Sequence, residues 1–314
     1  MAAPRHLVLV GPTAGGKSTV AMALARQRPD VELVSVDSMQ VYRGMDIGTS
    51  KPTPAEQTEV PHHLLDLADP AERFTVTRFA AAAKEALAGI ERRGHVGVLV
   101  GGTGLYLQAV LGDLEPPGEW PNVRAELEAD PDTAALHARL QRRDPQAAAR
   151  IEPSNRRRVI RALEVTEGSG APFSSFGPGV GAYPDRGRFL IRALWLPRAV
   201  VATRIEARVR SMMAGGLLDE VRRLAAGTPG TAGGGGGLGP TARQALGYKE
   251  LLEHLEQGRP LDECVERIIA RTRAFSVRQR RWFRRDPRLR WFATETNPVA
   301  VVGGLLRELE KCHP

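Results

Sequence analysis

The clearest chemical signal is the segment GPTAGGKS, from Gly11 to Ser18, which fits the pattern G-x-x-x-x-G-K-S/T. In this pattern the backbone amides and a helix start form a concave site for phosphate, the lysine adds a charge, and the hydroxyl can hold Mg²⁺. The chemistry requires a strand before the loop and a helix after it. The apolar run 7–10 and the stretch 17–28 meet this requirement, so the sequence predicts a phosphate site.

Two further segments follow predicted strands near this loop. Asp37 ends the second strand, and a carboxylate at that edge of a parallel sheet points into the same crevice as the phosphate loop. It could hold Mg²⁺ through water, act as a general base, or only cap a turn. GGTGLY, 101–106, follows the next strand and offers the hydroxyl of Thr103 where an ATPase often has an acid. We expect this segment to position a neutral group, which weakens an ATPase or kinase interpretation.

Several weaker candidates have less specific patterns. His62 and His63 are adjacent, without an obvious third ligand, and we expect a structural role rather than a metal site. Arg204 and Arg208 lie four residues apart in a predicted helix and could bind a diphosphate together. The run RRRVIRALEV, 156–165, offers a second set of arginines for contact with a phosphate backbone.

The elements that must position these residues alternate between strand and helix. Apolar runs at 7–10, 31–36 and 96–100 alternate with helical stretches at 17–28, 76–93 and from 103 onward, which predicts a parallel sheet covered on both faces. After Pro116 and Pro117, helical segments at 123–129, 133–143 and 155–166 follow without a strand. A strand at 189–196 and helices at 199–214 and 217–226 then resume the first pattern. We predict an α/β core like that of P-loop NTPases, 1–117 with 188–314, and a helical insertion, 118–187.

Charge is concentrated in one segment. The chain has a net charge of +8, and residues 271–290 contain nine arginines and one acid, so the rest of the chain sums to zero. A helix predicted at 260–285 places Arg267, Arg271, Arg278, Arg281 and Arg285 on one face, opposite an apolar face. A solvated face is the simpler interpretation of a charge run. Because no intervening acids at helical spacing neutralise this one, we predict instead that it binds a polyanion.

Composition limits the class of protein. The chain has 314 residues, 42% of them hydrophobic and 25% charged, which is typical of a soluble globular protein. No apolar run approaches the roughly 18 residues of a membrane span. Two cysteines cannot form a disulfide framework, and the first apolar run begins at Leu7 without room for a leader, so we expect a cytoplasmic protein. The glycine-rich stretch 228–240 is predicted to be a flexible loop.

Taken together, these segments resemble the tRNA dimethylallyltransferase family, also called tRNA isopentenyltransferases. The resemblance spans residues 11–285 in the family's order. The matching strings are GPTAGGKS, VDSMQVYRGMDIGTSKP, PHHLLD, GGTGLYLQAV, DPQAAARI, NRRRVIRALEV, RIEARVRSMMAGGLLDEV, QALGYKE and VRQRRWFRR. Gly15 stands where the family commonly has serine, and Ser18 replaces the usual threonine but keeps the hydroxyl.

The resemblance implies transfer of a dimethylallyl group from dimethylallyl diphosphate to the exocyclic amine of the tRNA adenine 3′ of the anticodon. It implies that Asp37 is the base, that Thr103 positions the reacting groups, and that Ser18 helps hold Mg²⁺. The implied diphosphate ligands are Gly11, Thr13, Ala14, Gly15, Gly16, Lys17, Ser18 and Arg208. The implied tRNA contacts are Asp37, Ser38, Met39, Gln40, Arg157, Arg158, Arg161, Gln244, Gly247, Tyr248, Lys249, Arg278, Gln279, Arg281, Trp282 and Arg285. We expect a monomer.

Two alternatives remain open at this point. A small-molecule kinase also combines a P-loop, an aspartate base and a helical lid, but it has no need for an arginine helix. A P-loop protein that binds RNA without catalysis would explain the arginines, but it leaves Asp37 and Thr103 without a role.

Overall fold

The structure is a computed structural model that describes residues 5–112, 117–177, 183, 187–227 and 237–312. It divides into two compact units, one comprising residues 1–113 and 185–314 and the other residues 114–184. The glycine-rich segment predicted to be a flexible loop lies largely outside the described residues. Within the described part of the chain, no helix is long and apolar enough to cross a membrane.

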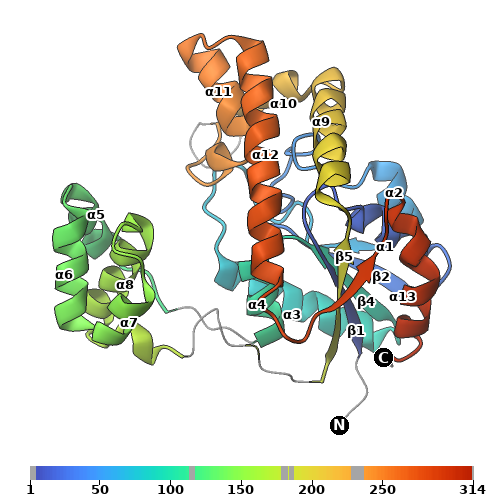
Figure 1. Ribbon diagram of the computed structural model, residues 1–314, viewed down its shortest axis with the longest axis horizontal. Coiled ribbons are helices and arrows are strands. Elements are labelled where there is room, and N and C mark those ends of the chain that lie inside the picture. Colours follow the sequence, from blue (N-terminus) through green and yellow to red (C-terminus); the bar gives the residue numbers. More distant parts are fainter. Residues whose placement is uncertain (1–4, 113–116, 178–182, 184–186, 228–236, 313–314) are drawn as a thin grey trace. The chain divides into compact units, whose positions relative to one another are not determined.

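The larger unit is built on one parallel sheet with strand order β3-β2-β4-β1-β5-β6 (Figure 1). The predicted strands are confirmed as β1 (His6–Val10), β2 (Val31–Val36), β4 (Val96–Gly101) and β5 (Phe189–Trp195). Two edge strands, β3 (His62–His63) and β6 (Arg290–Ala293), were not predicted. Both are too short to show a period in the sequence, and pairing with the sheet creates them.

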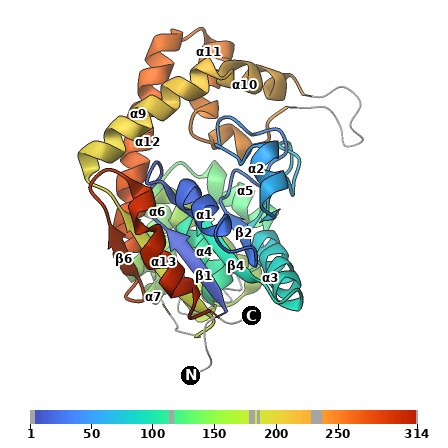
Figure 2. The same ribbon diagram turned by 90° about the vertical axis from the view of Figure 1, so that its right-hand side faces the viewer.

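Helices cover both faces of this sheet. Leu7 and Leu9 of β1 join a core with α1 (Lys17–Ala25) and α13 (Val302–Leu309), which lie in front of the sheet in Figure 2. Val8 and Val10 join the other core, which includes α3 (Val76–Arg92) and α4 (Gly104–Gly112). This alternation explains why the strands read as continuous apolar runs, since both faces are buried.

Four helices extend beyond the carboxyl edge of the sheet (Figure 1). They are α9 (Arg198–Ala214), α10 (Leu217–Ala226), α11 (Tyr248–Gln257) and α12 (Leu261–Phe283). The sequence predicted all but α11, whose start is marked by Gly247 and by Glu250, which accepts from the Gly247 N–H. A short helix, α2 (Pro54–Glu59), and α13 were also missed.

Helices are the only regular secondary structure among the described residues of the smaller unit. It contains α5 (Pro121–Ala129), α6 (Thr133–Arg143), α7 (Pro145–Arg150) and α8 (Arg156–Ser169). Leu127, Leu136, Leu140 and Leu163 form its own apolar core. The six-residue α7 was not predicted, because it is too short to show a helical period.

Candidate active site

The phosphate loop joins β1 to α1 in the context that the sequence pattern requires. Ala14 and Gly16 adopt left-handed conformations, with φ of 58° and 84°, and Gly15 N–H donates to the Pro12 carbonyl at 3.1 Å. A side chain at Gly16 would clash with Pro298, since a Cβ would lie 2.4 Å from that ring. The left-handed conformations of Ala14 and Gly16 stand on either side of Gly15, which has an ordinary φ, and such alternation lets backbone amides converge on one anion. Helix α1 begins at this loop without a side-chain cap or an acid in its first turn. The loop is therefore a cradle for an anion.

Three cations surround the cradle. Lys17 Nζ donates to the Pro12 carbonyl at 2.9 Å, and Arg204 Nε donates to the Ala14 carbonyl at 2.9 Å. Burial, with a further contribution from Arg208, lowers the pKa of Lys17 to about 8, although Asp37 opposes the shift. Burial and Arg204 also lower the pKa of Arg208, again against the effect of Asp37. The site therefore carries excess positive charge, which an anionic ligand would neutralise.

Asp37 stands at the carboxyl end of β2, facing this charge. Its Oδ1 accepts from the backbone N–H of Met39 at 2.8 Å and of Gln40 at 3.4 Å, so the predicted alternative of a turn carboxylate is correct for one oxygen. Its Oδ2 has no hydrogen-bond donor among the described residues. Thr103 is held nearby, because its Oγ1 accepts from the Ser38 N–H at 3.3 Å. The Asp37 side chain therefore caps a turn with Oδ1 and still presents Oδ2 as a free oxygen.

Part of this arrangement lines one cavity of ≈380 Å³ within the larger unit. Gly15, Gly16, Lys17, Ser18 and Arg204 are not among the residues that line it. The cavity extends from the phosphate loop, between α9 and α12, to the segment that precedes α11. Apolar side chains such as Val209, Met212 and Phe275 form much of its wall. The structure brings together in this cavity the predicted residues Thr13, Ala14, Asp37, Ser38, Met39, Thr103, Arg208, Gln244, Gly247, Tyr248 and Arg278.

Some residues predicted to contact tRNA use their polar groups inside the protein. Gln40 accepts from Ser35 Oγ at 2.7 Å and donates to the carbonyls of Thr49 and Ser50. Gln279 is only 7% exposed and is bonded at both ends of its amide. Both amides are bonded inside the protein at their oxygen and at their nitrogen, which indicates a supporting role, and their contact with tRNA stays a prediction.

Three other residues predicted to contact tRNA also make contacts that support the fold around the cavity. They are Gly247, Tyr248 and Trp282. Tyr248 is fully buried and its hydroxyl donates to Glu220, while the Gly247 N–H donates to Glu250 at 2.9 Å. Trp282 packs so closely on Gly104 that a Cβ there would lie 2.2 Å from its Nε1. Lys249 donates to Gln244 at 3.3 Å at the exposed edge of the same region.

Glu220 is a residue of this region that sequence reasoning missed. Its buried carboxylate accepts from the backbone N–H groups of Asp46, Ile47 and Gly48 at 2.7–3.1 Å, in addition to the Tyr248 hydroxyl. It therefore fixes one wall of the cavity. The only signal was an acid in the matching string RIEARVRSMMAGGLLDEV.

The arginine face of α12 is only partly as predicted. Arg267 pairs with Glu253 and Glu263, and Arg271 pairs with the buried Glu250, so the prediction that no acids neutralise this face was wrong for its first half. The acids come from α11, which was not predicted, and from one turn earlier in α12. The arginines of 271–290 without an ion pair among the described residues are Arg278, Arg280, Arg281, Arg284 and Arg285.

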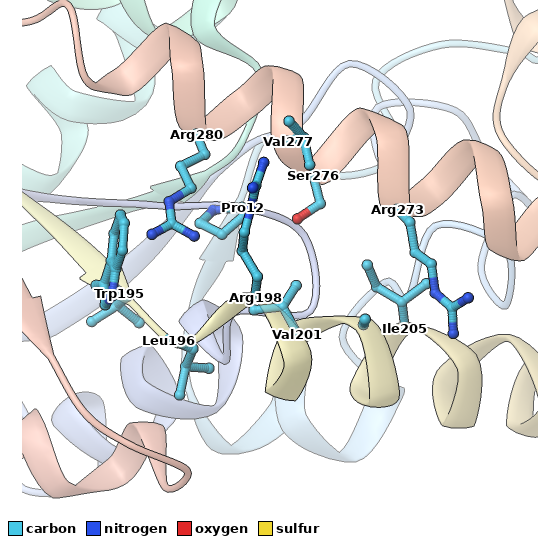
Figure 3. A pocket seen from close by; sticks show the side chains of 12 residues that line it. Pro12, Trp195, Leu196, Arg198, Val201, Ile205, Arg273, Ser276, Val277 and Arg280 are labelled. Atoms are coloured by element: carbon cyan, nitrogen blue, oxygen red, sulfur yellow. The ribbon is translucent and has the colours of Figure 1, made fainter.

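A second, smaller cavity of ≈190 Å³ lies between the end of β5, the start of α9 and the C-terminal half of α12 (Figure 3). Leu196, Val201 and Ile205 give it an apolar lining. The Arg280 guanidinium stacks on Trp195, 3.0 Å from the ring centroid. Burial and the neighbouring Arg284 and Arg198 lower the pKa of Arg280. None of the predicted site residues lines this cavity.

The remaining predicted arginines belong to the helical unit. Arg157 and Arg158 are exposed at the start of α8 and make no ion pair with a described residue. Arg161 pairs with the buried Glu164 at 3.0 Å and donates to the Pro117 carbonyl at 2.8 Å. Two of the three are thus available to an external phosphate.

The adjacent histidines have the structural role that was predicted. His63 bonds to Glu32 at 2.6 Å, and the same carboxylate takes two hydrogen bonds from Arg93 and one from His95. Burial alone would raise the pKa of Glu32, but these partners lower it to about 2. The described residues contain no cluster of three or more acids, histidines or cysteines suited to a metal ion.

A parallel sheet with a phosphate loop after its first strand and an aspartate after the next strand in the chain defines a P-loop α/β enzyme. Comparison with known proteins narrows this class. The family described as IPP transferase matches residues 40–286, and that described as isopentenyl transferase matches residues 4–68. The chain belongs to the tRNA dimethylallyltransferase family.

The similarity extends over the full chain. The tRNA dimethylallyltransferase of Anaeromyxobacter dehalogenans is 45% identical over 311 residues, 98% of this chain and 99% of the relative. The crystal structure of tRNA isopentenylpyrophosphate transferase from Bacillus halodurans has a TM-score of 0.68 and 36% identity, covering 98% of this chain and 95% of that one. A eukaryotic dimethylallyltransferase acting on tRNA has a TM-score of 0.74 and 26% identity. The match covers 93% of this chain and 74% of that one.

Proposed function

We propose that this protein transfers a dimethylallyl group from dimethylallyl diphosphate to the exocyclic amine of the adenine 3′ of the anticodon in tRNA. The observation that carries the proposal is one cavity whose lining joins Thr13 and Ala14 of the phosphate loop, and Arg208, to Asp37 and Thr103. Family membership supports tRNA as the acceptor, and the diphosphate donor is part of this proposal. A small-molecule kinase is not favoured, because the matching families and the similar proteins are tRNA prenyltransferases.

In this reaction the amine nitrogen forms a bond to the first carbon of the dimethylallyl group while the carbon–oxygen bond to diphosphate breaks. The electron pair of the broken bond leaves with diphosphate, so negative charge grows at the cradle. The start of α1 and the nearby cations Lys17, Arg204 and Arg208 would stabilise that charge. The amine proton passes to Asp37 Oδ2, and Thr103 orients the acceptor.

The residues present fit a role for Mg²⁺. The Ser18 hydroxyl is exposed at the start of α1 and has no hydrogen-bond partner among the described residues. Mg²⁺ usually keeps several waters and binds through one or two protein oxygens plus substrate phosphates, so a single hydroxyl beside a diphosphate site suffices. When bound, the ion would neutralise charge on the diphosphate.

Binding of tRNA is assigned to arginines that lack an acid partner. Arg278 lines the cavity, Arg281 lies in the last turn of α12, and Arg285 follows just after the helix ends. Arg157 and Arg158 add exposed charge on the helical unit. Because the target base is stacked in the anticodon loop, it must leave the stack to reach the cavity.

One assay tests this proposal. The protein is incubated with unmodified tRNA, Mg²⁺ and dimethylallyl diphosphate labelled in the prenyl group, without ATP. We expect label in tRNA, located at the adenine 3′ of the anticodon after nuclease digestion. If the tRNA is bound but stays unlabelled, the assignment is wrong.

A further inference from the structure

The side chain of Gln279 links the two loops that carry the proposed diphosphate and acceptor sites. The backbone N–H of Thr13 donates to Gln279 Oε1 at 2.8 Å, and Gln279 Nε2 donates to the Gly102 carbonyl at 2.9 Å. Thr13 follows β1 and Gly102 follows β4. These strands pair up to Val10 and Gly101, where the ladder ends. One amide from α12 therefore connects the two loops just past the last backbone pairing.

A glutamine side chain meets both requirements at this point. Thr13 presents a donor and Gly102 an acceptor, so the bridging group must accept at one atom and donate at the other, as a peptide unit does. Glutamate in its ionised form cannot donate, leucine can do neither, and asparagine is shorter by one methylene. Since Gln279 is 7% exposed, water cannot readily replace the lost partners, and each unpaired buried group is costly.

The glycines around Thr103 reflect the same close approach of α12. A Cβ on Gly102 would lie 2.3 Å from Gln279 Nε2, and a Cβ on Gly104 would lie 2.2 Å from Trp282 Nε1. Thr103 is thus held between two residues that contact α12 directly. The GGTG segment is glycine-rich because a helix packs on it, and the position of the Thr103 hydroxyl depends on that helix.

We propose that Gln279 is a positioning residue for prenyl transfer, which sets the phosphate loop and the Thr103 loop at the separation that the reaction needs. This inference rests on the proposed function. It assigns Gln279 an effect on turnover and none on tRNA affinity, because the residue is 7% exposed and its amide oxygen and nitrogen both bond inside the protein. A displacement of reacting groups by about 1 Å can cost roughly a hundredfold in rate.

The test compares Gln279→Leu with Gln108→Leu. Gln108 is also buried, 6% exposed, but its amide has no hydrogen-bond partner among the described residues. For Gln279→Leu we expect kcat at saturating tRNA and donor to fall by at least about tenfold. We expect its tRNA dissociation constant to stay within about twofold of the wild-type value. Gln108→Leu is expected to leave both unchanged. An unchanged kcat, or a loss confined to tRNA affinity, overturns the proposal.

A second variant keeps the test decisive if Gln279→Leu does not fold. In Gln279→Glu the new carboxyl group keeps the acceptor for Thr13 and regains a donor to Gly102 only when protonated. We expect its kcat, as a ratio to wild type at the same pH, to rise as pH is lowered from 8 to 6. A ratio that stays constant overturns the proposal, whereas a wild-type protein without transferase activity refutes the proposed function instead.

Discussion

Binding of diphosphate should take up a proton at Lys17. In the free protein, burial and Arg208 lower the pKa of this lysine to about 8 from the ordinary 10.5. At pH 8 about half of the molecules therefore hold an uncharged Lys17, and at pH 7 about a tenth do. A bound diphosphate favours the charged form and raises the pKa again. We expect uptake of about half a proton per diphosphate at pH 8 and about a tenth at pH 7.

The uptake is measured by isothermal titration calorimetry with inorganic diphosphate in two buffers of different ionisation enthalpy. Diphosphate itself also titrates, so the wild-type result is compared with Lys17→Arg, whose guanidinium keeps its proton throughout. The difference between the two proteins isolates Lys17. Above pH 8 the wild-type affinity should also fall by up to about tenfold per pH unit relative to the variant.

Equal proton uptake by the wild type and Lys17→Arg across pH 7–9 would refute this reasoning. It would mean that Lys17 is charged in the free protein and that its burial in the loop does not weaken its hold on the proton. The excess of positive charge at the cradle would then no longer be supported by the lowered pKa of Lys17 and would rest on Arg208 alone.

Three further predictions concern the base, the arginine face and the fold. Asp37→Asn keeps the turn oxygen but removes the base, so kcat should fall by about 10²–10⁴-fold without loss of tRNA affinity in a filter-binding assay; retained activity would exclude Asp37 as the base. Replacing Arg278, Arg281 and Arg285 by alanine should make the slope of log affinity against log salt shallower by about 2, whereas the acid-paired arginines earlier in the helix should not affect it. Glu32→Gln should lose about 3 kcal/mol of stability above pH 4.5. Because the folded pKa of Glu32 is about 2, that difference should vanish as pH falls through 2 in urea melts, and a difference constant with pH would contradict it.

The sequence by itself determined the local chemistry and the four central strands of the sheet. The phosphate loop could be predicted because its backbone conformation needs glycines at fixed spacing between a strand and a helix, as Gly16 shows. The buried strands could be predicted because both faces of a parallel sheet are covered, which leaves continuous apolar runs. Asp37 could be placed in the site because consecutive strands of such a sheet end at one edge.

The tertiary structure alone decided which polar residues face a ligand. Periodicity placed Arg271 and Arg278 on the same helical face, but α11 brings Glu250 to the first and leaves the second beside the cavity. Gln279 lies in a run of arginines, yet it is buried because α12 packs on loops that are more than 170 residues distant in sequence. Partners so far apart in the chain leave no local pattern. The sequence therefore identifies the chemistry of a side chain, whereas the fold decides whether that chemistry is used inside the protein or offered to a substrate.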